Sequence, residues 1–265
     1  MFSSSRLRHF ALTVTVRLPR RSSFSSYRSS TREILRLGAP RSGPLLLFSP
    51  GHVLGYDPLL KVARWVCERL VQDGSGSARA HGRRPGFRAD PRLSPQAAAR
   101  PFDLRGSGFN RGHLAAAANA TCRRSLQFSF LMSNVVAQPA AVNGGVWRRL
   151  EGRARALAAL GPVWVTSGPL FVPRVEADGS VALHVPLVGA SRLPVPTHLF
   201  KLLVYHGKGG QLTSEAFVVR NGPENGAEAL RECAVTVEEL ERLSGLRLLP
   251  RVRRRELHQL TAADL

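Results

Sequence analysis

Residues 105–119 read Arg-Gly-Ser-Gly-Phe-Asn-Arg-Gly-His-Leu-Ala-Ala-Ala-Ala-Asn. Within this stretch Arg111 precedes His113 by two positions, and Gly112 between them has no side chain to hinder a substrate. A neutral imidazole accepts a proton from water near pH 7 without a shifted pKa. A guanidinium keeps its charge and binds two phosphate oxygens at once. The stretch therefore predicts a site where a base and a fixed cation face a phosphate group.

A second group of polar residues follows at helical spacing. Asn143, Trp147 and Glu151 recur every four residues, which places them along one face of a helix that we expect from Asn143 to about Leu160. An amide oxygen such as that of Asn143 is a hard ligand that Mg²⁺ accepts while keeping most of its waters. Glu151, two turns further, would reach such an ion through a bound water. Together with the arginine and histidine of the first stretch, these residues provide the parts needed to hydrolyse a phosphodiester with one hydrated divalent metal.

Each of these residues taken alone has a simpler explanation. An isolated histidine such as His113 is more often a structural residue than a catalyst. Asn143 before Gly144-Gly145 is equally explained as a helix cap. A lone Glu151 is typical of a solvated helix surface. What favours catalysis is the occurrence of these residues together, in this order and at this spacing.

The combination resembles the active-site signature of the DNA/RNA non-specific endonucleases, and within that family it is most similar to the mitochondrial endonuclease G branch. The resemblance extends over roughly residues 52–250. It implies an α+β fold of the ββα-metal (His-Me finger) type, with a central antiparallel sheet flanked by helices. Further segments that carry the resemblance are 56–58, 64–66, 133–135, 166–171, 195–198 and 243–246.

The resemblance also implies a role for individual residues. In this family the motif histidine activates water, the helix asparagine is the only direct protein ligand of one Mg²⁺ or Mn²⁺, and the glutamate steadies a metal-bound water. Carried over to this chain, these positions are His113, Asn143 and Glu151, with Arg111 on the scissile phosphate. The residues expected to contact nucleic acid are Arg105, Asn110, Arg111 and Asn134, the last matching an asparagine of the family's site region.

Two positions depart from the family pattern. Asn110 stands where the motif has an aspartate, so a charge that could orient Arg111 is replaced by an amide of similar size. Ala120 stands where endonuclease G has a further histidine. The sequence thus leaves two functions open. The first is a sugar-non-specific endonuclease, and the alternative is a catalytically weak or silent nucleic-acid-binding protein on the same scaffold.

The charge of the chain is strongly positive. The sequence has 38 basic and 18 acidic residues, a formal net charge of +20, and only Lys61, Lys201 and Lys208 are lysines. One interpretation is a surface that binds the phosphates of DNA or RNA. The alternative is coding bias, because arginine, alanine, glycine and proline are plentiful together. Net charge therefore agrees with a nucleic-acid substrate without establishing it.

The chain is expected to have three parts. Residues 1–45 are predicted to be a mitochondrial targeting presequence without fixed structure, because residues 1–40 contain eight arginines, one acidic residue and many serines. The alternative is a plain disordered basic tail. Residues 46–250 form the nuclease domain, and 251–265 a fraying basic tail. The apolar run 10–16 is too short to span a bilayer, so we expect no stable membrane span. Family likeness suggests a homodimer.

Outside the site, local patterns predict further elements. Residues 62–67 are ambiguous between strand and helix by pattern, and the resemblance favours a strand. Residues 72–101 are predicted to form a long surface loop. Strands are expected at 125–132, 163–166, 181–187, 199–205 and 216–219, with a hairpin turn at 178–179.

Near the C-terminus, Thr236 is expected to cap a short helix that Gly245 ends. His184 and His198 are interpreted as structural residues. The three cysteines lack the spacing of a metal site and are predicted to be buried free thiols; they are Cys67, Cys122 and Cys233.

Overall fold

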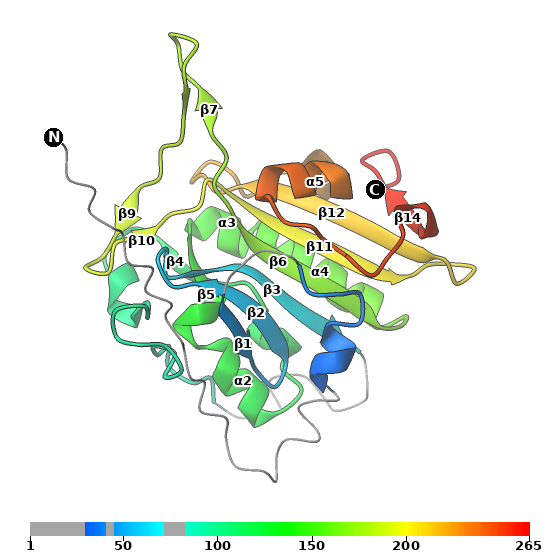
Figure 1. Cartoon of the computed structure of the whole chain (residues 1–265), viewed down its shortest axis with the longest axis horizontal. Coiled ribbons are helices and arrows are strands. Elements are labelled where there is room, and N and C mark those ends of the chain that lie inside the picture. Colours follow the sequence, from blue (N-terminus) through cyan, green and yellow to red (C-terminus); the bar gives the residue numbers. More distant parts are fainter. Residues whose placement is uncertain (1–29, 41–44, 72–82) are drawn as a thin grey trace, which may run out of the picture.

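The computed structural model describes residues 30–40, 45–71 and 83–265. Its centre is an eight-stranded sheet in the order β1-β2-β3-β6-β11-β12-β13, with β14 paired parallel to β12 and the other pairs antiparallel (Figure 1). This confirms the expected antiparallel sheet. The strands of this sheet are β1 (Leu45–Phe48), β2 (His52–Asp57), β3 (Val62–Leu70), β6 (Val163–Leu170), β11 (His198–His206), β12 (Leu212–Arg220), β13 (Ala234–Val235) and β14 (Leu257–Leu260).

Apolar side chains alternate along the long strands and supply a core on each face of the sheet. On β11, Leu199 and Leu203 belong to the core under α4 (Val146–Ala158), whereas Phe200 and Leu202 belong to the core under α5 (Val237–Ser244). Successive side chains of a strand point to opposite faces, which explains this division. Figure 1 shows α4 and α5 on opposite sides of the sheet.

The motif stretch folds into a two-stranded unit followed by a helix. β4 (Asn110–His113) pairs antiparallel with β5 (Val135–Gln138), and α3 (Ala140–Gly144) begins two residues later. This β4-β5-α3 unit lies beside the large sheet, in agreement with the expected ββα fold (Figure 1). The register places Asn110, at the start of β4, opposite Gln138, the last residue of β5 before α3.

The helix expected from Asn143 to Leu160 is wrong in one respect, because it is two helices. Asn143 lies inside α3, and Gly145 separates α3 from α4 with backbone angles φ −98° and ψ −113°. A Cβ at Gly145 would lie 2.3 Å from the Gly226 carbonyl oxygen and 2.4 Å from that of Ala141. The glycine thus permits a close approach of two backbones that bends the chain here.

The strand expected over residues 125–132 is wrong, because this segment begins with helix α2 (Arg123–Ser129). Cys122 caps the helix by accepting a hydrogen bond from the Ser125 amide at 3.4 Å, and the Ser125 hydroxyl accepts one from the Cys122 amide at 3.1 Å. This reciprocal capping satisfies the backbone amides of Cys122 and Ser125 at the start of the helix. Alternation of apolar residues over so short a run does not distinguish a strand from a buried helix.

Other expected elements are present. β3, β6, β11 and β12 confirm four of the predicted strands, and residues 83–100 are largely irregular, as expected; residues 72–82 lie outside the described part of the chain. Thr236 caps α5 by accepting a hydrogen bond from the Glu239 amide, and Gly245 ends the helix at φ +65°. The remaining helical turns are η3 (Pro101–Leu104), η4 (Ala117–Asn119), η5 (Met132–Asn134), η6 (Leu230–Cys233) and η7 (Arg254–Glu256).

Residues 181–187 do not form the single strand expected. β7 (Arg174–Val175) and β8 (Val181–Ala182) form a hairpin that projects from the body, and β9 (Leu187–Val188) pairs with β10 (Leu193–Pro194) (Figure 1). The predicted turn at Asp178-Gly179 is confirmed, with Gly179 at φ +82°. His184 lies on this hairpin with its Nε2 2.9 Å from a carboxylate oxygen of Glu176.

The folded part begins earlier than the boundary expected at residue 45. A short helix over residues 30–34 packs on the α5 side of the sheet, where Ile34 is buried and the Glu33 carbonyl accepts a hydrogen bond from Trp164 Nε1 at 2.9 Å. At the other end, the tail expected to fray supplies β14 instead. Residues 1–29 of the expected presequence lie outside the described part of the chain.

The cysteines differ in part from the expectation of buried free thiols. The described cysteines are free, but only Cys67 and Cys233 are buried; Cys122 is exposed, because a helix N-cap position faces solvent here. No helix within residues 30–40, 45–71 and 83–265 has both the length and the apolar character needed to cross a bilayer.

Candidate active site

His113 is the last residue of β4, and its imidazole is packed between aromatic rings. The Nε2 atom is buried and has no hydrogen-bond partner among residues 30–40, 45–71 and 83–265, and the ring centroid lies 5.2 Å from that of Phe87 and 4.9 Å from that of Phe130. Burial lowers the pKa of His113 to about 4, and the nearby charge of Arg84 acts in the same direction. The imidazole is therefore neutral at pH 7, the state in which it accepts a proton.

The backbone around His113 is held by two buried side chains. Trp147 Nε1 donates a hydrogen bond to the His113 carbonyl oxygen at 3.0 Å. The Asn134 side chain accepts a hydrogen bond from the Ala115 amide at 2.9 Å and donates to the carbonyl oxygens of Ala115 and Ser129 at 2.9 and 3.0 Å. Asn134 has no exposed surface. Its expected contact with nucleic acid is not supported, because its amide is used to fix the loop after His113.

Arg111 is oriented by a backbone carbonyl in place of a carboxylate. Its Nε and Nη2 atoms donate hydrogen bonds to the Pro101 carbonyl oxygen at 3.0 and 2.6 Å, and its guanidinium lies 5.5 Å from the Phe87 ring centroid. Asn110, where the family motif has its aspartate, is exposed at the start of β4, and Arg105 is exposed at the end of η3. The fixed direction of Arg111 thus does not depend on residue 110.

Asn143 and Glu151 lie on either side of the break between α3 and α4. Asn143 within α3 and Glu151 on α4 are both partly exposed. Burial raises the pKa of Glu151, whereas the cationic side chains of Lys201, Arg155 and Arg148 oppose this shift. The Trp147 hydrogen bond to His113 ties the same helix to β4, so these groups belong to one region of the fold.

Two charged residues beneath α4 were not anticipated from the sequence. Glu68 of β3 and Lys201 of β11 are both buried, and burial raises the pKa of Glu68 to about 7. The Glu68 carboxylate accepts a hydrogen bond from Asn119 Nδ2 at 3.0 Å. For Lys201 the available signal was a charged residue in the middle of an otherwise apolar strand, since such residues are rarely buried without a partner.

Gln138, at the end of β5, is a further polar residue that the sequence did not single out. It is fully buried, and neither its Oε1 nor its Nε2 has a hydrogen-bond partner among the described residues. A Cβ at Gly112 would lie 2.1 Å from Gln138 Cδ, so the glycine of the Arg-Gly-His motif is needed to admit this side chain. The motif glycine therefore has a packing role, because its missing side chain leaves the space that Gln138 fills.

The donors present suit a hydrated hard cation held by few protein atoms. Within the part of the chain that the structure describes, no group of three or more His, Cys, Asp and Glu residues could enclose a metal. The region instead offers the Asn143 amide oxygen, the Glu151 carboxylate and the orphaned buried Nε2 of His113. Mg²⁺ retains several waters and needs only one or two protein oxygens, which this set provides.

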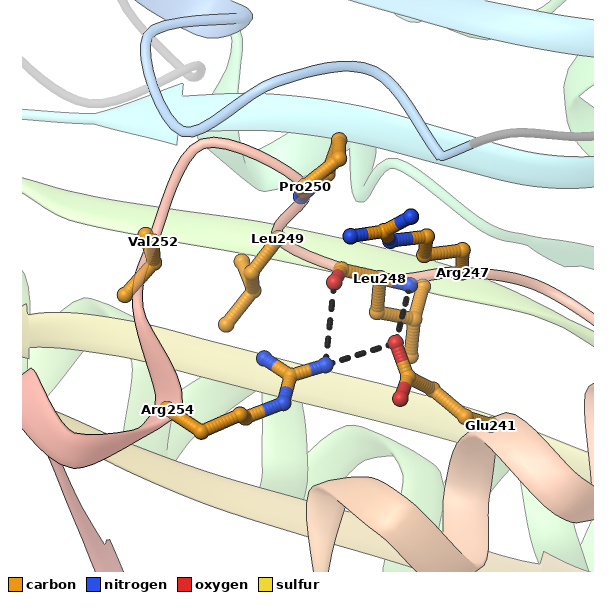
Figure 2. Close-up of a pocket in the computed structure, with 7 residues that line it drawn as sticks. All are labelled: Glu241, Arg247, Leu248, Leu249, Pro250, Val252 and Arg254. Atoms are coloured by element: carbon orange, nitrogen blue, oxygen red, sulfur yellow. Dashed lines mark hydrogen bonds and ion pairs between the residues drawn. The ribbon is translucent and has the colours of Figure 1, made fainter.

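A hollow on the α5 side of the sheet has a different character. It has a volume of about 240 Å³ and lies between α5 and residues 247–254 (Figure 2). Two of its charged residues pair with each other: Arg254 Nη2 lies 2.6 Å from Glu241 Oε1 and donates to the Leu248 carbonyl oxygen at 3.0 Å. We therefore interpret this hollow as a structural junction of the C-terminal segment.

Comparison with known proteins places the chain among nucleases. A model of the DNA/RNA non-specific endonuclease family matches residues 30–255. The chain is 38% identical over 205 residues to "Endonuclease G, mitochondrial" of Bos taurus, covering 76% of this chain and 68% of that protein. It is 36% identical over 237 residues to "Nuclease EXOG, mitochondrial" of Danio rerio, covering 88% and 69%. A chain in the crystal structure of an EndoG/EndoGI complex superimposes with a TM-score of 0.82 at 28% identity, covering 87% of this chain and 95% of that one.

Proposed function

Because the chain belongs to the DNA/RNA non-specific endonuclease family, we propose that it cleaves phosphodiester bonds within DNA and RNA with His113 as general base and one Mg²⁺ or Mn²⁺. The observation that carries this proposal is the Nε2 atom of His113, which is buried, unpaired and part of a neutral imidazole. A buried nitrogen without a partner is costly, and a bound water or substrate group would satisfy it.

The proposed chemistry assigns one step to each group. His113 Nε2 removes a proton from the attacking water. Arg111, held in direction by the Pro101 carbonyl, offers its charge to an oxygen of the scissile phosphate. Asn143 would hold the metal directly, and Glu151 would hold it through a bound water. When bound, the cation supplies Lewis-acid stabilisation of the negative charge that develops on the phosphate.

The alternative of a silent nucleic-acid-binding protein rested on Asn110 and Ala120. Asn110 is exposed, and the hydrogen bonds of Arg111 go to Pro101. Ala120 packs in a small apolar cluster beside α2. Neither substitution removes a group that the proposed chemistry uses, which favours the active enzyme.

Cleavage assays on the full chain test the proposed function. Plasmid DNA and a single-stranded RNA are incubated with the protein in the presence of Mg²⁺, Mn²⁺ or EDTA. We expect cleavage that the chelator abolishes, and a loss of about a hundredfold or more in His113→Ala, the range of a missing general base. Binding without cleavage under every metal condition would establish the silent alternative.

The metal ligand is tested by comparing two asparagines. Asn143→Ala is expected to raise the Mg²⁺ concentration needed for half-maximal cleavage far more than Asn119→Ala, because Asn119 is hydrogen-bonded to Glu68 and Arg155. Equal shifts in the two variants would refute the choice of Asn143.

Mitochondrial location and homodimerisation are also part of the proposal. Two observations support the location: the relatives described above are named as mitochondrial, and residues 1–40 have the composition of a presequence. Dimerisation rests on the resemblance alone. Imaging of a C-terminal fluorescent fusion with and without residues 1–29 tests the location, and light scattering of the purified chain tests the dimer.

A further inference from the structure

Lys201 is a buried cation in the middle of the large sheet. It is 1% exposed and lies on the face of β11 that α4 covers. Its Nζ atom donates a hydrogen bond to the Ser167 hydroxyl of β6 at 2.6 Å. Moving an ammonium group into a protein interior costs several kcal/mol unless other groups compensate for the lost water. The position therefore calls for specific partners.

One partner is an aromatic ring of the candidate site. Lys201 Nζ lies 4.2 Å from the centroid of the Trp147 ring, a distance typical of a cation–π interaction. The same ring donates its Nε1 hydrogen to the carbonyl oxygen of His113. Lys201 thus touches the side chain that holds the backbone of the proposed general base.

Two carboxylates belong to the same region, that of Glu68 on β3 and that of Glu151 on α4. Burial lowers the pKa of Lys201, whereas the negative charges of Glu151 and Glu68 oppose this shift. The same attraction acts on the acids, because Lys201 is the strongest opposing charge felt by both Glu68 and Glu151. The cation therefore lies close enough to both acids to influence their ionisation.

This group of charges is extended by a second set of contacts. Asn119 Nδ2 donates to Glu68, and Arg155 Nη1 lies 3.4 Å from Asn119 Oδ1, so α4 is joined to β3 as well as to β11. Trp147, Glu151 and Arg155 recur every four residues on α4. One face of α4 therefore rests on buried polar groups of the sheet, whereas the neighbouring stripe rests on apolar ones.

We propose that Lys201 is a positioning residue for phosphodiester cleavage: its ammonium holds the Trp147 ring against the sheet, and through Trp147 it fixes the backbone of His113. Lys201 itself contacts neither substrate nor metal in this proposal. Without it, Glu68 and Glu151 repel each other across a poorly solvated space and the indole loses its cationic neighbour. This inference rests on the proposed nuclease function.

The main test compares Lys201→Met with Lys208→Met. Both variants replace a lysine by an uncharged side chain of similar length, but Lys208 lies exposed in the turn between β11 and β12. We expect Lys201→Met to lower kcat on plasmid DNA by about tenfold or more, with KM changed less than about threefold, because misplacement affects the reacting groups more than substrate binding. Lys208→Met should keep wild-type kcat.

Two readouts separate positioning from general loss of structure. The emission of Trp147, isolated by subtracting the spectrum of the matching Trp147→Phe protein, should shift in Lys201→Met and stay unchanged in Lys208→Met. The double variant Lys201→Met with Glu68→Gln should recover a substantial part of kcat, because it removes one of the two repelling carboxylates while keeping an acceptor for Asn119.

The results for these variants support or overturn the positioning role of Lys201. If Lys201→Met does not fold, Ser167→Ala replaces it, with an expected loss in kcat of about two- to tenfold from the missing hydrogen bond and a smaller shift in Trp147 emission. A wild-type protein without metal-dependent cleavage would refute the proposed function, and Trp147 emission would still report the contact. An active wild type would overturn the positioning role if Lys201→Met equalled Lys208→Met, or if the double variant recovered nothing.

Discussion

At the scale of single residues, Gly112 shows how one missing side chain shapes the site. Its Cα faces the buried amide of Gln138, and an added Cβ would approach Gln138 Cδ and Oε1 to 2.1 and 2.4 Å. Glutamine at this position has no room to retreat, because it is fully buried. The same glycine separates the arginine from the histidine in sequence, so packing against Gln138 requires a glycine at the centre of the motif.

Gly112→Ala is therefore expected to destabilise the fold by about 1–3 kcal/mol, as overpacking does in a filled core. Urea unfolding followed by circular dichroism measures this change. The double variant Gly112→Ala with Gln138→Ala should be less destabilised than the sum of the two single variants, because the added methyl enters the space that the amide leaves. Strict additivity would show that the two residues do not interfere.

His113 provides the second test at this scale. Burial and the charge of Arg84 both disfavour the imidazolium form, so the pKa of His113 lies near 4 instead of its ordinary 6.5. Protonation, and with it loss of the base, is expected only as the pH falls toward 4. An NMR titration of the His113 ring, assigned with His113→Gln, should show no chemical-shift change between pH 7.5 and 5.5. A titration midpoint near 6.5 would contradict the buried, unpaired state.

At the scale of elements, the junction between α3 and α4 explains which parts of the site were predictable. Local spacing predicted that Asn143, Trp147 and Glu151 share a helical region, and the family resemblance identified His113. The break at Gly145 was not predictable, because it depends on the carbonyl of Gly226, which is distant in sequence. Glu68 and Lys201 were missed for the same reason, since only the sheet brings β3 and β11 under α4.

Adjacent glycines at this junction allow a matched comparison. Gly145→Ala is expected to cost about 2 kcal/mol or more, because its Cβ would meet backbone oxygens that cannot move aside. Gly144→Ala meets no atom within 4 Å and should stabilise α3 by about 0.5–1 kcal/mol through the better helix propensity of alanine. Urea unfolding of both variants checks the difference, and similar effects at the two positions would argue against the bend.

At the scale of the whole molecule, the sheet was easier to predict than the chain ends. The sequence pattern of the long strands predicts them, because their apolar residues point alternately into the two cores. Residues 30–40 were assigned to a presequence and residues 251–265 to a tail, because the basic composition of residues 1–40 and 251–255 is that of unfolded segments. Their order comes from contacts between the two ends, such as the hydrogen bond from the Arg251 amide to the Leu37 carbonyl at 3.2 Å. Composition cannot report such a contact.

Acid sensitivity of the fold follows from its buried histidines. His52 is 2% exposed, and burial, with the charge of Arg92, lowers the pKa of His52 to about 3. Because the unfolded chain binds this proton near pH 6.5 and the folded chain does not, stability is complete above 6.5 and is lost progressively as the pH falls toward 3. Glu68 acts in the opposite direction, since its raised pKa favours the protonated folded state.

A comparison with His52→Gln isolates this contribution, because all other titrating groups are common to both proteins. Between pH 7.5 and pH 5.0 the free energy of unfolding of the wild type should fall by roughly 2 kcal/mol more than that of the variant, the amount expected for a proton taken up only after unfolding. Urea titrations at the two pH values measure both losses. The variant itself is expected to be less stable at pH 7.5, since glutamine fills the histidine site imperfectly. Parallel losses in the two proteins would mean that His52 is already protonated, or accessible to water, in the folded state.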